Sequence, residues 1–257
     1  MNPGNVRIIL VEPAGPLNVG SVARVMKNMG LHQLVLVNPQ CDPLGEEARQ
    51  MAVHGADILE TAQQVGTLPE ALKGCQRAIA TTARPRKQPT PLETPRQALP
   101  WLLTKENKSA LIFGPEDRGL NNLELNYAQR FVCIPSSAEY PSLNLAQAVA
   151  VCCYELFVSA QQPSTQQQAL VESQPPLVTA VDTASWAEIE DYYQHLQALL
   201  LKIGYLYPHT AQARMEKFRR LFNRVAMTKD EVTMLRGILR QMEWASRPQS
   251  QSESKDK

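Results

Sequence analysis

The sequence predicts an α/β protein: a parallel sheet with helices around it, followed by a small all-α domain. Through residues 1–160, short apolar runs bounded by Gly, Pro or Asn alternate with helical patterns. This alternation is typical of parallel strands joined by helices. The later part of the chain has helical patterns with capping signals.

The first part contains short aliphatic runs that predict buried strands of a parallel sheet. These predicted strands are residues 6–11, 34–37, 78–82, 110–113 and 131–134. Between them, residues 21–29 place apolar side chains on one helical face and are followed by Gly30, a residue suited to a helix end. Residues 67–74 open with a Thr-x-x-Glu capping box, and residues 143–160 form the longest predicted helix of this part.

A change of composition marks the end of the sheet-forming part. Gln, Ser and Pro dominate after residue 160, whereas capping boxes at Ser185 and Thr228 and a helix-ending Gly204 predict a three-helix unit further on. The predicted division is 1–160 for the sheet domain, 161–179 for a flexible linker, 180–246 for a helical domain and 247–257 for a disordered tail.

Composition excludes several classes of function. The chain has no apolar stretch near the roughly 20 residues that span a bilayer, and its N-terminal segment lacks a signal-peptide pattern. Five cysteines form no C-x-x-C pair and four histidines show no ligand spacing. We therefore expect a cytoplasmic protein with no membrane partner and no metal.

The loop after the first strand does not fit the common nucleotide sites. Gly15 and Gly20 match the two glycines of a phosphate-binding loop, but Ser21 and Val22 stand where Lys and Ser or Thr are required. No G-x-G-x-x-G follows a predicted strand. Both the nucleotide triphosphate and the dinucleotide interpretations fail.

Polar residues instead gather where strands end, the edge at which an open α/β sheet binds ligands. The segments are 18–24, 113–120 and 140–145. Taken alone, each polar residue also has an ordinary structural explanation that involves no ligand. Arg24 is equally a solvated surface arginine, Glu116 a loop carboxylate, and Asn18 a common capping residue.

Taken together, the segments resemble the SPOUT superfamily of RNA methyltransferases, most closely its TrmH-like 2′-O branch. The elements are N-x-x-S-x-x-R from Asn18 to Arg24, F-G-x-E-x-x-G-L from Phe113 to Leu120, and S-L-N from Ser142 to Asn144. The resemblance implies a C-terminal trefoil knot in the sheet domain, S-adenosyl-L-methionine as methyl donor, tRNA as substrate and a homodimer. The helical domain and the Thr-Thr-Ala-Arg run from Thr81 are similar to members that methylate a cytidine or uridine at the start of the tRNA anticodon loop.

In that family the donor is held largely by backbone groups. Carried onto this chain, the donor-binding residues are Thr81, Thr82, Ala83, Gly114, Ile134, Pro141, Ser142 and Leu143. Pro141 has no amide hydrogen, so it offers one donor fewer.

The resemblance also implies five catalytic residues: Arg24, Ser142, Asn18, Glu116 and Asn144. A guanidinium stays protonated far above neutral pH, which disfavours Arg24 as a simple base. We expect it to bind the phosphate beside the target ribose and to stabilise the developing alkoxide, while Ser142 hydrogen-bonds the hydroxyl or the base. Asn18 and Glu116 are expected to orient Arg24, and Asn144 to hold the loop of Ser142.

Basic residues suggest where RNA lies, although a solvated surface is the alternative for each group. Arg84, Arg86 and Lys87 occupy a Pro-rich loop, and helical spacing aligns Arg214, Lys217, Arg220 and Arg224 along one stripe. Two rival functions remain: a 2′-O-methyltransferase for another tRNA or rRNA site, and a non-catalytic RNA-binding protein on the same fold.

Overall fold

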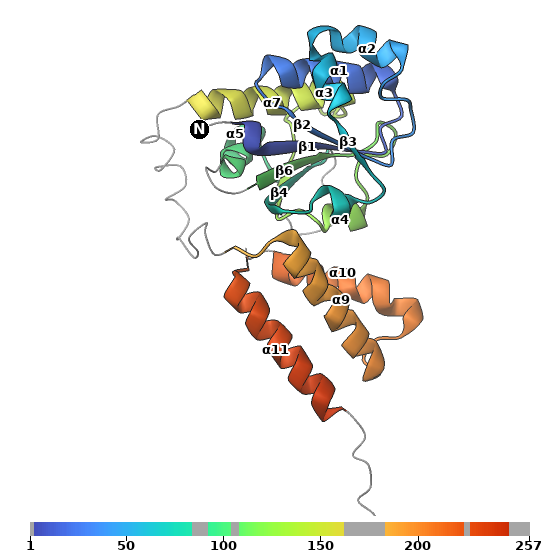
Figure 1. Cartoon of the computed structure of the whole chain (residues 1–257), viewed down its shortest axis with the longest axis vertical. Coiled ribbons are helices and arrows are strands. Elements are labelled where there is room, and N and C mark those ends of the chain that lie inside the picture. Colours follow the sequence, from blue (N-terminus) through green and yellow to red (C-terminus); the bar gives the residue numbers. More distant parts are fainter. Residues whose placement is uncertain (1–2, 84–91, 104–107, 162–182, 224–226, 247–257) are drawn as a thin grey trace, which may run out of the picture.

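A computed structural model describes residues 3–83, 92–103, 108–161, 183–223 and 227–246. Its first part is a sheet covered by helices, and a group of three helices lies beyond one face of that sheet (Figure 1). The fold class predicted from the sequence, a parallel α/β sheet followed by a helical region, is confirmed. The trefoil knot stays a prediction.

The sheet has seven parallel strands in the order β3-β2-β1-β6-β4-β7-β5. Their bounds are Val6–Val11 for β1, Gln33–Val37 for β2, Gln63–Val65 for β3, Cys75–Thr81 for β4, Leu92–Glu93 for β5, Lys108–Phe113 for β6 and Arg130–Val132 for β7. The five predicted strands correspond to β1, β2, β4, β6 and β7. The sequence missed β3 and β5 because these short edge strands carry no apolar run.

Helices cover both faces of the sheet. Those of the first part are α1 Pro16–Asn28, α2 Glu46–Ala52, α3 Ala56–Glu60, α4 Leu68–Ala71, α5 Pro95–Ala98, α6 Asn122–Leu125 and α7 Leu145–Gln161. Alternate side chains of β1 point to opposite faces of the sheet. Ile8 and Leu10 pack beneath α1 and α7, and Ile9 and Val11 belong to the core on the opposite face. On that opposite side lie α4 and the helical region (Figure 1).

Three predicted helix boundaries were wrong, and local sequence explains two of them. The helix expected at residues 21–29 begins at Pro16, because proline suits a first helical position. The helix expected from residue 143 begins at Leu145, since the Oδ1 of Asn144 accepts a 2.9 Å hydrogen bond from the N–H of Ala146 and caps it. The helix expected over residues 67–74 ends at Ala71.

The helical region consists of α9 Trp186–Lys202, α10 Pro208–Asn223 and α11 Lys229–Ala245. The capping boxes predicted at Ser185 and Thr228 are both present, and Gly204 follows α9 with a φ of +75°. The predicted linker lies outside the described residues apart from Gln161, and the predicted tail lies wholly outside them. No helix among the described residues is long and apolar enough to cross a membrane.

One arginine ties the helical region to the sheet domain. Arg219 of α10 forms an ion pair of 2.6 Å with Glu190 of α9, and its guanidinium lies 4.5 Å from the ring centre of Tyr193 and 5.5 Å from that of Tyr127. Tyr127 follows α6 and also packs against Trp186. The contact fixes α9 and α10 against the turn that follows α6.

Candidate active site

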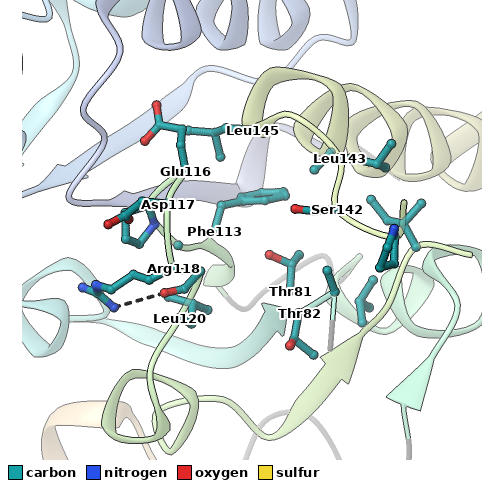
Figure 2. A pocket seen from close by; sticks show the side chains of 18 residues that line it. Thr81, Thr82, Phe113, Glu116, Asp117, Arg118, Leu120, Ser142, Leu143 and Leu145 are labelled. Atoms are coloured by element: carbon teal, nitrogen blue, oxygen red, sulfur yellow. Dashed lines mark hydrogen bonds between the residues drawn. The ribbon is translucent and has the colours of Figure 1, made fainter. Parts of the chain in front are cut away.

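A pocket opens at the carboxyl ends of β4, β6 and β7, the edge where ligands bind in an open α/β sheet (Figure 2). All eight residues that the sequence suggested for donor binding line it: Thr81, Thr82, Ala83, Gly114, Ile134, Pro141, Ser142 and Leu143. Three segments far apart in sequence therefore meet around one cavity.

The loop after β6 packs so closely on itself that Gly114 admits no side chain. A Cβ at this position would lie 2.3 Å from the backbone nitrogen of Leu120 and 2.4 Å from the carbonyl carbon of Gly119. Gly119 has a φ of +66°, a conformation that favours glycine. At this wall the pocket therefore presents backbone rather than side chain, as a donor held by backbone groups requires.

Hydrogen bonds fix the other two walls. The hydroxyl of Thr81 donates to the carbonyl oxygen of Ile112 at 3.0 Å, and the N–H of Thr82 donates to the carbonyl oxygen of Val132 at 2.9 Å. On the third segment, the hydroxyl of Ser136 donates to the carbonyl oxygen of Pro141 at 2.9 Å. In Figure 2 the side chain of Ser142 points into the pocket toward Phe113.

Glu116 holds the rim of the pocket to the start of α1. Its carboxylate accepts hydrogen bonds from the Nδ2 of Asn18 at 2.8 Å and from the N–H groups of Ala14 and Gly15 at 3.1 Å each. Partial burial raises the pKa of Glu116, but these hydrogen bonds outweigh it and keep that pKa below its ordinary value. Glu116 is therefore an ionised anchor rather than a proton acceptor.

The same asparagine connects Glu116 to the segment that carries Ser142. The Nδ2 of Asn144 donates to the Oδ1 of Asn18 at 3.0 Å, while the Oδ1 of Asn144 caps α7. Asn18 thus lies between Glu116 and Asn144, and the hydrogen bonds of the Asn144 side chain hold the backbone two residues after Ser142.

The predicted orientation of Arg24 by Asn18 and Glu116 was wrong within one chain. Arg24 is exposed, lies outside the pocket lining, and makes no hydrogen bond or ion pair with any residue that the structure describes. Six residues separate it from Asn18 on α1, which turns the two side chains about 120° apart around the helix.

Arg118 is a pocket residue that sequence reasoning missed. Its guanidinium pairs with Glu12 at 2.6 Å and with Glu124 at 3.0 Å, and the hydrogen bonds that it donates to both carboxylates raise its pKa. The two ion pairs join the loop that lines the pocket to the end of β1 and to α6. No sequence pattern pointed to Arg118, because a charged residue in a polar loop is ordinary.

The structure divides the residues suggested for RNA binding. Arg220 was predicted to face RNA, but it donates to the Oδ1 of Asn126 at 3.2 Å and to Glu216 at 3.3 Å, so it contacts the sheet domain. Arg214 and Lys217 are exposed. Arg84, Arg86 and Arg224 lie outside the described residues, as does Lys87.

The pocket fits S-adenosyl-L-methionine in its chemistry. Leu120, Ile134 and Leu143 supply apolar wall, while the tight backbone at Gly114 and the end of β4 supply polar groups. A cavity that combines apolar walls with fixed polar groups suits a ligand that contains both a purine and charged groups. Among the described residues, no group of three or more His, Cys, Asp or Glu side chains is arranged to hold a metal ion.

Comparisons with known proteins agree with this geometry. Residues 5–154 match the model of the SpoU rRNA Methylase family, and residues 187–254 match the tRNA methyltransferase TrmJ, C-terminal domain. The chain is 42% identical over 257 residues to the tRNA (cytidine/uridine/adenosine-2′-O-)-methyltransferase TrmJ of Pseudomonas aeruginosa, covering 98% of each chain. It is 40% identical over 243 residues to the tRNA (cytidine/uridine-2′-O-)-methyltransferase TrmJ of Escherichia coli K12, covering 93% of this chain and 95% of the relative.

Solved structures give the same result. The crystal structure of TrmJ from Z. mobilis ZM4 superposes with a TM-score of 0.79 at 32% identity, over 92% of this chain and 98% of that one. A probable methylase family protein from Haemophilus influenzae superposes with a TM-score of 0.58 at 30% identity, over 95% and 97% of the two chains. The chain therefore belongs to the SpoU methylase family, and within that family to the TrmJ methyltransferases.

Proposed function

We propose that this protein transfers a methyl group from S-adenosyl-L-methionine to the ribose 2′-hydroxyl of a cytidine or uridine at the start of the tRNA anticodon loop. The names of the TrmJ relatives support the reaction and the substrate class. The observation that carries the proposal is that two family motifs line one pocket, and that Asn18 of the third motif is hydrogen-bonded to both of them through Glu116 and Asn144.

The donor-binding residues have distinct tasks in this proposal. When bound, S-adenosyl-L-methionine supplies a methyl group already activated by its sulfonium. The backbone from Thr81 to Ala83 and at Gly114 would hold its polar groups, and Ile134 and Leu143 would exclude water. We expect the donor to bind a preformed pocket, because hydrogen bonds within the chain already fix its walls.

Orientation of the ribose is the main remaining requirement. Holding two reactants in line lowers the activation barrier by about 7–11 kcal/mol. Ser142 lies in the pocket wall and offers a hydroxyl to the ribose or the base. Its backbone is fixed by Asn144 on one side and by the Ser136 contact with Pro141 on the other.

We infer that Arg24 reaches the site from a second copy of the chain. Arg24 is exposed and lies outside its own pocket, and the same side of the sheet carries half-exposed apolar residues: Leu17 at 50%, Met51 at 38% and Val53 at 48%. Apolar exposure of this kind is typical of an interface between protein subunits. In a homodimer, Arg24 would bind the phosphate next to the target ribose and stabilise the developing alkoxide.

The helical region is the proposed RNA-binding part. Arg214 and Lys217 of α10 are exposed cations suited to phosphate, whereas Arg220 serves the contact with the sheet domain. The proposed division is residues 1–160 for catalysis, 161–179 as linker, 180–246 for RNA binding and 247–257 as tail. A tRNA substrate implies a cytoplasmic protein.

Methyl transfer to a defined tRNA transcript tests the proposal. Labelled donor, wild-type protein and a transcript with ribose at the first anticodon-loop nucleotide should give one methyl group per RNA, and a chelator should leave the yield unchanged. The same transcript with 2′-deoxyribose at that nucleotide should accept none. Equal labelling of both transcripts would overturn the proposal. Binding of RNA without any methyl transfer would favour a non-catalytic RNA-binding protein.

A further inference from the structure

Two half-exposed tyrosines stand at the turn between α9 and α10. Tyr205 is 52% exposed and Tyr207 is 56% exposed, whereas Leu206 between them is 1% exposed. The N–H of Leu206 donates to the carbonyl oxygen of Leu200 at 2.9 Å, which fixes the turn on the end of α9. Burial of the middle residue therefore holds both rings in the solvent.

Each ring has a flat, nitrogen-containing neighbour. The guanidinium of Arg214 lies 5.6 Å from the ring centre of Tyr205, and its Nη1 also donates to the carbonyl oxygen of Tyr205 at 3.0 Å. The imidazole of His209 stacks on Tyr207 with ring centres 6.0 Å apart and an angle of 24° between the planes. Stacked planar groups with exposed faces are the usual means of binding unpaired nucleobases.

The charge around this turn suits RNA. Arg214 and Lys217 are both exposed, and the first turn of α10 contains no acidic residue. The nearest acid of that helix, Glu216, is engaged by Arg220 at 3.3 Å. An exposed pair of cations beside aromatic rings attracts a phosphate backbone and repels a basic protein surface.

The turn lies far from the donor pocket. Figure 1 shows it at the end of α9 remote from the sheet, and α9, with 17 residues, is about 25 Å long. A group bound there cannot be the nucleotide that is methylated by the same chain. It belongs to another part of a large RNA, or to RNA bound at the partner's site.

We propose that Tyr205, Tyr207, His209 and Arg214 form a platform on which unpaired bases of the RNA substrate stack. The inference deepens the proposed function and rests on it in taking tRNA as the ligand. It names a contact that reads unpaired regions of the RNA, in addition to the phosphate contacts of Lys217.

Substitution of the rings in the full-length protein tests the platform. Tyr205→Leu and Tyr207→Leu should each weaken tRNA binding about tenfold, the typical loss for one stacked base, while Tyr205→Phe and Tyr207→Phe stay within about twofold of wild type. Binding is measured by anisotropy of labelled tRNA over a range of salt concentrations. The leucine variants should keep the wild-type salt slope, whereas Lys217→Ala should reduce it by about 1.

Two outcomes overturn the platform. The first is that the leucine variants bind tRNA as tightly as the wild type, which would indicate that the rings contact a protein partner instead of RNA. The other is phenylalanine variants that lose as much affinity as leucine variants at an unchanged melting temperature, which would indicate contacts of the hydroxyls instead of stacking. Methyl transfer by the wild-type protein is measured in parallel. If RNA binding depends on the rings but no methyl group is transferred, the proposed function is wrong and the platform stands. If methyl groups are transferred but RNA binding does not depend on the rings, the platform is wrong and the proposed function stands.

Discussion

The Nδ2 of Asn18 donates a 2.8 Å hydrogen bond to the Oε1 of Glu116, although 98 positions separate the two residues in the sequence. The other end of the same amide accepts from Asn144 at 3.0 Å. One side chain at the start of α1 therefore connects the loop after β6 to the segment that carries Ser142. Residues that look like separate motifs in the sequence act as one support for the pocket.

Replacement of Asn18 should disturb the pocket without unfolding the chain. Asn18→Ala removes both hydrogen bonds, each worth about 1 kcal/mol or slightly more, and we expect donor affinity to fall about tenfold in calorimetry. Asn18→Asp should be worse at neutral pH, because it sets a second carboxylate against Glu116, and should recover as the pH falls. Equal donor affinity of wild type and both variants would contradict this role.

The lowered pKa of Glu116 predicts a pH dependence of stability. A carboxylate whose folded pKa is lowered stabilises the fold above its ordinary value of 4.5, and that stabilisation is lost as the pH falls through the folded pKa. Glu116→Gln should therefore cost about 1 kcal/mol of unfolding free energy at pH 7 and less at pH 4, where the ordinary carboxyl of the unfolded chain is already largely protonated. Denaturant titrations at the two pH values measure this. Glu139→Gln, which alters an exposed carboxylate without a hydrogen-bond donor among the described residues, is the matched control and should show no such difference.

The close packing at Gly114 predicts that even a methyl group there is harmful. Gly114→Ala places a Cβ 2.3 Å from the nitrogen of Leu120, and because the obstacle is backbone the loop must move. We expect a loss of about 1–3 kcal/mol in stability and more than tenfold in donor affinity. Gly237→Ala is the control, since its Cβ meets nothing within 4 Å in α11, and it should stabilise the protein by roughly 0.5–1 kcal/mol. Similar effects of the two changes would refute the packing argument.

Arg24 acting across a dimer predicts complementation between two inactive variants. Arg24→Ala should lower turnover at least about a hundredfold and leave donor binding intact, and Ser142→Ala should also lower turnover. In a mixed dimer, the pocket of the Arg24→Ala chain receives Arg24 from its partner, so mixing the two variants should restore part of the activity. Activity that stays at the level of the single variants after subunit exchange would show that Arg24 serves its own chain. Light scattering gives the stoichiometry.

The ion pair between Arg219 and Glu190 predicts a large loss of stability on truncation. Only 14% and 19% of these side chains are exposed, so Arg219→Ala leaves a carboxylate with little water around it. We expect a loss of about 2–4 kcal/mol in the transition that unfolds the helical region. Lys27→Ala removes a pair with Asp57 in which 41% and 54% of the side chains are exposed, and should cost at most about 1 kcal/mol. Melting curves that rank the two variants in the opposite order would contradict the role of Arg219 in holding the helical region against the sheet domain.

Sequence patterns predicted the elements whose cause is local. The central strands carry continuous apolar runs because both faces are buried, and the capping boxes at Ser185 and Thr228 mark helix starts by side-chain chemistry alone. The polar edge strands β3 and β5 had no such signal, since they exist only because a neighbouring strand offers hydrogen bonds.

The site divides in the same way. Residues that line the pocket were predicted through motifs, because each motif follows a strand of one sheet edge. The pairing of Asn18 with Glu116, the isolation of Arg24 and the inward contact of Arg220 depend on how distant segments pack. No spacing in the sequence contains that information.

Mass-spectrometric mapping of ribose methylation tests the central claim most directly. Transfer RNA incubated with the wild-type protein and S-adenosyl-L-methionine should acquire one 2′-O-methyl group, on the cytidine or uridine that begins the anticodon loop, and far less in the same time with Arg24→Ala. A methyl group found on a base, or no new methyl group on any ribose, would contradict it.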